Sequence, residues 1–94
     1  MSRLGDEVEY LEDEVYRLGE ESGFFSKKDD LTVGELGEFK HKYHYGLETW
    51  IEVYENGCIV YHNGNKKIYR DREEAFRTVK ILAQREKHLR RMLG

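Results

Sequence analysis

The sequence predicts an α+β fold: a helix, a three-stranded antiparallel meander with a fourth strand as an alternative, and a long C-terminal helix. Apolar residues recur at helical spacing near both ends of the chain. Between these segments, Asn56-Gly57 and Asn63-Gly64 separate three short apolar runs, and Asn-Gly between such runs is a strong hairpin signal. The 94 residues are enough for one domain with a modest core.

The first predicted helix spans Ser2–Ser22 and lies in an acidic segment over residues 1–23. Ser2 is suited to cap its start, and Gly23 is suited to end it in the left-handed conformation. Its apolar residues recur at alternating spacings of four and three, the pattern of a coiled-coil seam. The seam consists of Leu4, Val8, Leu11, Val15 and Leu18. This seam can face the core of its own chain or join two chains, and because it is narrow we favour a homodimer.

Residues 24–46 form a loop that leads into the candidate fourth strand. Thr32 and Glu35 have the spacing of a capping box, which predicts a short helical turn through Leu36. From Phe39 to Tyr45, aromatic side chains and His41 alternate with lysines and His44. This alternation predicts an additional strand that ends at Gly46.

Residues 47–70 form the predicted meander. A two-residue first turn places Glu55 opposite Cys58. One face of the sheet then carries Ile51, Val53, Cys58, Val60 and Tyr69, and the other carries Trp50, Tyr54, Ile59, Tyr61 and Ile68. Because both faces are apolar, one covering helix leaves the other face exposed.

Residues 71–94 form the last predicted helix, which runs from Arg72 to about Leu93. Asp71 is suited to cap it, and Glu74 has the spacing of a capping partner. A helix of this length spans about 33 Å, whereas a short strand spans less than about 20 Å. The helix therefore overhangs its sheet, and its far end needs the first helix or another chain to cover it.

Charge is distributed unevenly along the chain. Residues 1–47 carry twelve acidic and six basic side chains, whereas residues 48–94 carry seven acidic and ten basic ones, within a net charge of −3. The single cysteine, Cys58, excludes an intramolecular disulfide and indicates a reducing compartment. No apolar run is long enough for a leader or a membrane span, so the sequence predicts a soluble, cytoplasmic protein.

Metal-binding and catalytic patterns are weak. His41 and His44, followed by Cys58 and His62, superficially resemble the spacing of a zinc finger. In strands, however, His41 and His44 point to opposite faces, and Cys58 lies about 13 Å from His62. We therefore expect a buried thiol and surface histidines, with no catalytic, cofactor-binding or metal-binding residues and no enzymatic activity.

The function predicted from the sequence is that of a small, non-enzymatic interaction protein, an adaptor or inhibitor that occludes or bridges a macromolecular partner. The predicted contacts to a protein partner are Trp50, Tyr54 and Tyr61, because an exposed aromatic patch is a common interface signature. Small acidic domains without catalytic groups are typical of virus-encoded or mobile-element-encoded inhibitors and adaptors.

The alternative function is nucleic-acid binding through the basic side of the last helix, with the sheet aromatics as stacking surfaces. The predicted phosphate contacts are Arg77, Lys80, Lys87 and Arg91. The order helix, three antiparallel strands, helix is similar to that of double-stranded RNA-binding domains, and the three-stranded sheet followed by a helix resembles the arm-binding domains of phage integrases. The last helix begins with Asp71-Arg72-Glu73-Glu74 where the RNA-binding family has lysines, and no family is assigned.

Overall fold

The computed structural model describes residues 3–94, with side chains from Glu9 onward. Helix α1 (Arg3–Ser22) and the 3-10 turn η1 (Val33–Leu36) precede the sheet, and helix α2 (Arg72–Leu93) follows it. The strands are β1 (Phe39–His44), β2 (Thr49–Tyr54), β3 (Cys58–His62) and β4 (Asn65–Tyr69), and they form one antiparallel sheet in chain order. The predicted α+β fold is confirmed, and the candidate fourth strand is present as β1. The predicted cap Ser2 and the side chains of Leu4 and Val8 lie outside the described residues.

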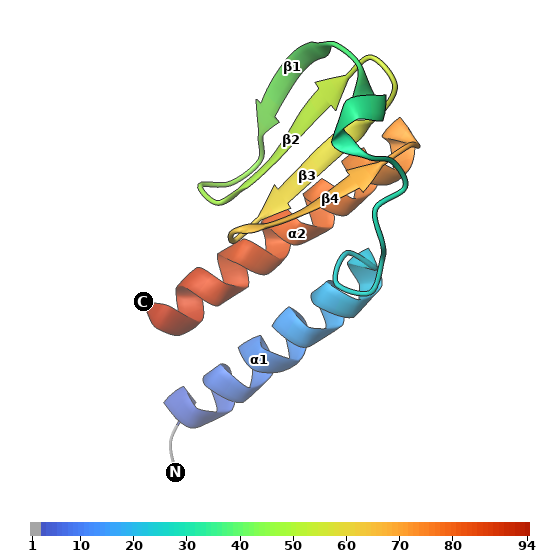
Figure 1. Ribbon diagram of the computed structural model, residues 1–94. Helices are drawn as coiled ribbons and strands as arrows, with labels where there is room; N and C mark the ends of the chain where they lie inside the picture. The colour runs from blue at the N-terminus through green and yellow to red at the C-terminus, as the bar shows by residue number, and fades with distance from the viewer. Residues whose placement is uncertain (1–2) are drawn as a thin grey trace.

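Helix α2 covers one face of the sheet, which we call the inner face (Figure 1). The five residues that the sequence placed together on one face are all buried there: Ile51, Val53, Cys58, Val60 and Tyr69. Ala75, Val79 and Leu82 of α2 complete this core together with Phe24. The apolar side chains that alternate along the strands and those that recur at helical spacing along α2 therefore pack in one cluster.

The opposite face of the sheet, which we call the outer face, is covered in part by the loop between α1 and β1. Leu31 of this loop and Leu36 of η1 pack on Ile59 and Ile68. The sequence reading considered only a helix as a cover for this face. In the structure a loop covers part of this face, because its side chains Leu31 and Leu36 pack on residues of β3 and β4.

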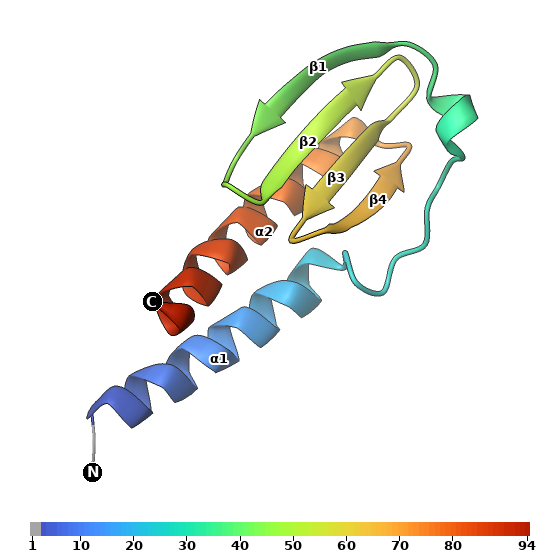
Figure 2. The same ribbon diagram turned by 60° about the vertical axis from the view of Figure 1, so that its left-hand side comes forward.

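Helix α1 lies along α2 and runs in the opposite direction, so both chain ends project past the same end of the sheet (Figures 1 and 2). The seam residues Leu11, Val15 and Leu18 are buried within the chain. The molecule is accordingly elongated, with extents of 55 × 22 × 19 Å. The predicted overhang of the last helix is confirmed, and α1 covers it. The homodimer inferred from the seam stays a prediction.

The first hairpin turn differs from its prediction. Val53 pairs with Cys58, so the register is shifted by two residues, which leaves every side chain on its predicted face. Asn56 and Gly57 do not adopt positive φ angles. A glycine is needed at position 57 for a different reason: the backbone passes close to Tyr69. A Cβ atom on residue 57 would lie 2.5 Å from the carbonyl oxygen of Tyr69.

The second hairpin turn follows its prediction. Asn63 and Gly64 both have positive φ, 48° and 87°, and His62 pairs with Asn65 on either side of them. Two successive positive φ angles define the type I′ turn that Asn-Gly favours.

The predicted helix boundaries are largely confirmed. Gly23 has a φ of 71° just after α1, and Asp71 caps α2 by accepting a hydrogen bond from the Glu73 N–H at 2.9 Å. Glu74 does not complete a capping box, because its carboxylate lies 3.6 Å from Lys27 Nζ.

Candidate functional site

The two edges of the sheet differ in how their backbone groups are satisfied. At the β4 edge, the Asp30 N–H donates to the Ile68 carbonyl at 2.9 Å, and the Asp29 carboxylate accepts from the Ile68 N–H at 2.9 Å. The Asp30 carboxylate also accepts from the Arg70 N–H at 3.1 Å. The loop between α1 and β1 thus closes the C-terminal half of this edge with one backbone bond and two carboxylates.

The β1 edge is open. Within the described residues β1 pairs only with β2, and all six of its residues are exposed. The Tyr45 N–H donates to Thr49, which fixes the alternation of hydrogen-bonded pairs along the strand. By this alternation the N–H groups of Lys42 and His44 point away from β2. β1 is therefore the place where the backbone of a further strand can pair.

Side chains of opposite character flank this open edge. On the outer face, Lys42 lies over the ring of Trp50 at 4.8 Å, and the His44 ring lies 5.4 Å from the same indole. On the inner face, Tyr43 and Tyr45 pack against Phe76 of α2, with ring centroids 5.7 and 6.5 Å away. The edge thus has a polar row with the Lys42 cation on one side and an aromatic row on the other.

Large exposed apolar side chains are concentrated at this edge. Tyr43 is 44% exposed and Tyr45 37%, although both side chains reach toward α2. Phe39 at the start of β1 and Leu47 just after it are exposed as well. Phe39 packs on Tyr54 of the outer face, whereas Tyr43 and Tyr45 pack on Phe76, so exposed apolar side chains border β1 on both faces of the sheet.

The predicted partner contacts Trp50, Tyr54 and Tyr61 do lie together on the outer face. The indole of Trp50 stacks on Tyr61 with a centroid distance of 4.8 Å and an interplanar angle of 16°. Lys42 lies over the indole as well, so the Trp50 ring contacts both Tyr61 and Lys42. Tyr54 and Tyr61 pack against the cluster beneath Leu31. All three are only partly exposed, so they border the open edge and do not form a free aromatic platform.

Both tyrosine hydroxyls are held by one carboxylate. Tyr54 and Tyr61 donate to Glu52 Oε1 at 2.9 and 3.3 Å. Burial and the Glu52 carboxylate raise the pKa of Tyr54 to about 12 and also raise that of Tyr61. These tyrosines therefore stay neutral donors and have a structural role on the outer face.

The basic residues of the nucleic-acid alternative are all exposed on α2: Arg77, Lys80, Lys87 and Arg91. Helix α2 covers the inner face, whereas Trp50 and Tyr61 lie on the outer face. The two parts of the predicted nucleic-acid surface are consequently separated by the sheet. The basic side of α2 and the aromatic pair do not form one continuous groove.

The sequence reading was wrong about His62, which it placed at the surface. Its side chain is fully buried and joins a chain of hydrogen bonds. Arg85 Nη1 lies 2.8 Å from Nε2 of His62, and the Thr49 hydroxyl lies 2.8 Å from Nδ1. Thr49 donates to Glu86 Oε1 at 2.6 Å, so its oxygen is left to accept from Nδ1 and the arginine donates to Nε2. Burial, together with the charge of Arg85, lowers the pKa of His62 to about 4.

Glu86, which interrupts the apolar stripe of α2, holds the turn between β1 and β2. Its carboxylate accepts from the N–H groups of Leu47 and Glu48 at 2.9 and 3.0 Å as well as from Thr49. Burial opposes its ionisation, but these hydrogen bonds outweigh it and lower the pKa of Glu86. The buried carboxylate thereby fixes the turn that positions one end of β1.

Residues suited to metal binding or nucleophilic chemistry do not converge in the described part of the chain. No group of three or more His, Cys, Asp or Glu side chains from Glu9 onward is placed to hold a metal ion. His41 and His44 lie on opposite faces of β1, as their spacing predicts. Cys58 is buried, and this burial raises the pKa of its thiol, which favours the unreactive protonated form.

Comparison with protein families, with curated proteins and with solved structures finds no match to this chain. None of the described helices combines the length and the apolar character that crossing a membrane requires.

Proposed function

We propose that this chain is a non-enzymatic interaction protein that binds a protein partner by adding a strand of that partner to β1. The observation that supports this proposal is the difference between the sheet edges: Asp29 and Asp30 close the C-terminal half of the β4 edge, and β1 is left open along its length. An open edge is an aggregation hazard that proteins usually cover or block. Strand addition is a recurring mode of peptide recognition that uses such an edge.

The side chains beside β1 indicate the chemistry of the partner. A partner residue opposite Lys42 or His44 points to the outer face, where an acidic side chain complements the charge of Lys42 and can accept a hydrogen bond from His44. The next residue points to the inner face, beside Tyr43 and Phe76, where an apolar side chain is favoured. The expected partner segment is extended and alternates acidic with apolar residues.

A second copy of the chain is a poorer occupant of this edge. Two β1 strands paired with each other would place the lysines of one strand near those of the other, which is unfavourable. The chain as a whole is acidic, so a cationic edge strand is a local feature and not the consequence of a basic composition. Binding at this edge would occlude the partner strand, as an adaptor or inhibitor requires.

A fluorescence titration tests this proposal, because Trp50 is the only tryptophan and contacts Lys42. The probe is a short capped peptide in which Glu and Val alternate, and the control is the same peptide with Lys in place of Glu. We expect the acidic peptide to change the Trp50 emission saturably and the basic peptide to leave it unchanged. Equal responses to both peptides, or none, would refute the proposal.

Two charge reversals separate this proposal from the nucleic-acid alternative. Lys42→Glu should weaken binding of the acidic peptide by about tenfold, because it repels the probe at the edge. Lys80→Glu is the matched control on α2 and should change that affinity by less than about twofold. Nucleic-acid binding that is lost with Lys80→Glu and kept with Lys42→Glu would favour the alternative instead.

A further inference from the structure

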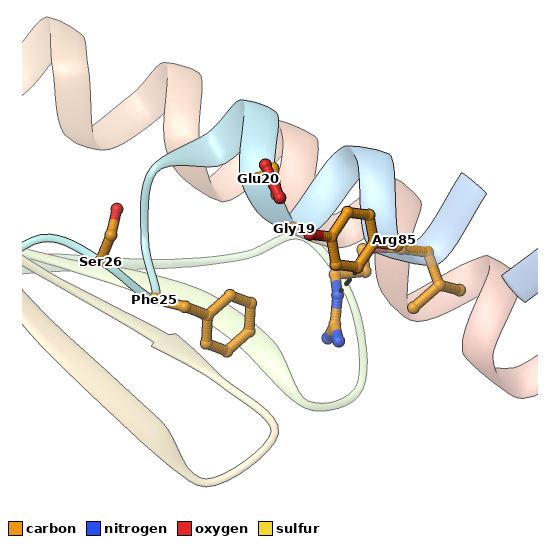
Figure 3. A pocket seen from close by; sticks show the side chains of 7 residues that line it. Gly19, Glu20, Phe25, Ser26 and Arg85 are labelled. Carbon is orange, nitrogen blue, oxygen red and sulfur yellow. Dashed lines mark hydrogen bonds between the residues drawn. The ribbon is translucent and has the colours of Figure 1, made fainter. Parts of the chain in front are cut away.

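A cavity of about 460 Å³ lies between the C-terminal half of α1, the loop that follows it and Arg85 of α2 (Figure 3). It is distinct from the β1 edge. Its lining is Val15, Tyr16, Gly19, Glu20, Phe25, Ser26 and Arg85. Figure 3 shows the guanidinium of Arg85 beside the ring of Phe25, with Glu20 away from it on α1. The volume is in the usual range for a small-molecule site, about 300–1,000 Å³.

Arg85 is a partly buried cation whose charge is not neutralised. Its Nη1 is directed to the neutral imidazole of His62, and its Nε donates to the Val15 carbonyl at 3.3 Å. Its guanidinium also lies 4.8 Å from the centre of the Phe25 ring. Among the described residues no carboxylate lies within ion-pair distance of it, although buried charges are normally paired.

The remaining wall of the cavity is largely apolar. Val15, Phe25 and the aromatic ring of Tyr16 supply it, and Gly19 lets the chain approach closely, because a Cβ there would lie 3.2 Å from Arg85 Nε. Glu20 is the one carboxylate in the lining. It interacts with the Tyr16 hydroxyl on the same helix and raises the pKa of Tyr16.

We infer that this cavity binds a monocarboxylate with an aromatic or branched apolar body, held by the guanidinium of Arg85. Guanidinium groups match the planar geometry of a carboxylate, and Phe25 and Val15 offer contacts for the body of the ligand. A single negative charge fits better than a phosphate dianion, because one cation, Arg85, and one carboxylate, Glu20, line the cavity. The same chemistry is offered by a free carboxylic acid and by the C-terminus of a peptide that ends in an apolar residue.

Titration of the full chain with benzoate, monitored by ¹⁵N NMR, tests this inference. We expect saturable shifts of the Gly19 and Phe25 amide signals and of the Arg85 Nε–H signal, with a Kd on the order of 1 mM for so small a ligand. Benzamide, which has the same shape without the charge, should bind at least about tenfold more weakly. Equal binding of benzamide, or no shifts with benzoate, would overturn the inference.

A tripeptide that ends in Phe distinguishes the two ligand sources. Its free-acid form should bind more tightly than its C-terminal amide, and equal or weaker binding of the free acid counts against the inference. Tighter binding of the free-acid peptide than of benzoate identifies a peptide C-terminus as the ligand. Tighter binding of benzoate identifies a free carboxylic acid.

Two substitutions locate the charge that is responsible. Glu20→Gln removes the one negative charge of the cavity lining, at an exposed position, and should tighten benzoate binding by roughly threefold. Arg85→Gln should abolish it. Because Arg85 also contacts His62, this variant can unfold, and Glu20→Gln then decides the question: unchanged or weaker benzoate binding in that variant would refute the site.

Discussion

Thr49 donates its hydroxyl proton to Glu86 across 2.6 Å and thereby joins the start of β2 to the distal half of α2. The same hydroxyl oxygen is within hydrogen-bond distance of His62, which in turn contacts Arg85. A cation and a carboxylate are thus connected through two neutral groups inside the protein. This arrangement explains how polar side chains from three elements are buried beside an apolar core.

Removal of the Thr49 hydroxyl should therefore be costly. Thr49→Val keeps the shape of the side chain but leaves the buried Glu86 and His62 each without one partner, at a cost of about 2–3 kcal/mol in the free energy of unfolding. Thr49→Ser retains the hydroxyl and is the matched control, with a smaller loss. Urea denaturation of both variants measures the difference, and equal stability of the two would exclude the hydrogen-bond chain as the cause.

Protonation of His62 should make the stability depend on pH. The pKa of His62 is about 4 in the folded chain, against an ordinary value of 6.5, so between these values the unfolded chain binds a proton that the folded chain does not. Stability should therefore fall as the pH is lowered from 6.5 toward 4, by on the order of 3 kcal/mol from this residue.

Comparison with a variant that cannot titrate at this position isolates the effect. His62→Gln is expected to be less stable than the wild type at pH 7, because it loses part of the hydrogen-bond chain. Its stability should decline less steeply between pH 6.5 and pH 4. Parallel pH profiles for the two proteins would show that His62 titrates normally.

The close approach at Gly57 should make this position intolerant of a side chain. A Cβ atom in Gly57→Ala would collide with the backbone oxygen of Tyr69, and the expected loss is about 2 kcal/mol or more. Gly34→Ala is the control, because nothing lies within 4 Å of a Cβ there, and it should change the stability by less than about 0.5 kcal/mol. A neutral Gly57→Ala in thermal denaturation would contradict this explanation of the first turn.

The seam of α1 should contribute to the stability of each single chain. Val15 is buried within the chain, so Val15→Asp places an unpaired charge in the contact with α2 and should destabilise the fold by at least about 3 kcal/mol. Tyr10→Asp changes an exposed residue of the same helix and should have little effect. Light scattering tests the predicted homodimer at the same time: a dimer that Val15→Asp converts into a stable, folded monomer would place the seam between chains.

Periodic patterns predicted the parts of this fold that depend on local geometry. The alternation from Ile51 to Tyr69 assigned the faces of the sheet correctly even though the first register was wrong, because a shift of two residues preserves the face. The lengths of the last helix and its strands likewise predicted the overhang that α1 covers.

The features that remained hidden depend on contacts between distant segments. The burial of His62 requires Thr49, Arg85 and the loop after α1 to converge, and no spacing in the sequence reports this. The open edge has the same origin: β1 is a candidate binding strand only because Asp29 and Asp30 reach the far side of the sheet and close β4. The expectation of an uncovered aromatic face led to Trp50, Tyr54 and Tyr61, which are only partly exposed and lie beside that edge.

Amide hydrogen exchange tests the proposed strand addition most directly. The N–H groups of Lys42 and His44 point away from β2, so they should exchange rapidly in the free protein. With a saturating amount of the alternating Glu–Val peptide, we predict that both amides become protected while the Ile68 amide, already bonded to Asp29, is unchanged. Peptide binding that leaves the Lys42 and His44 amides as unprotected as before would contradict the proposal that β1 is the binding edge.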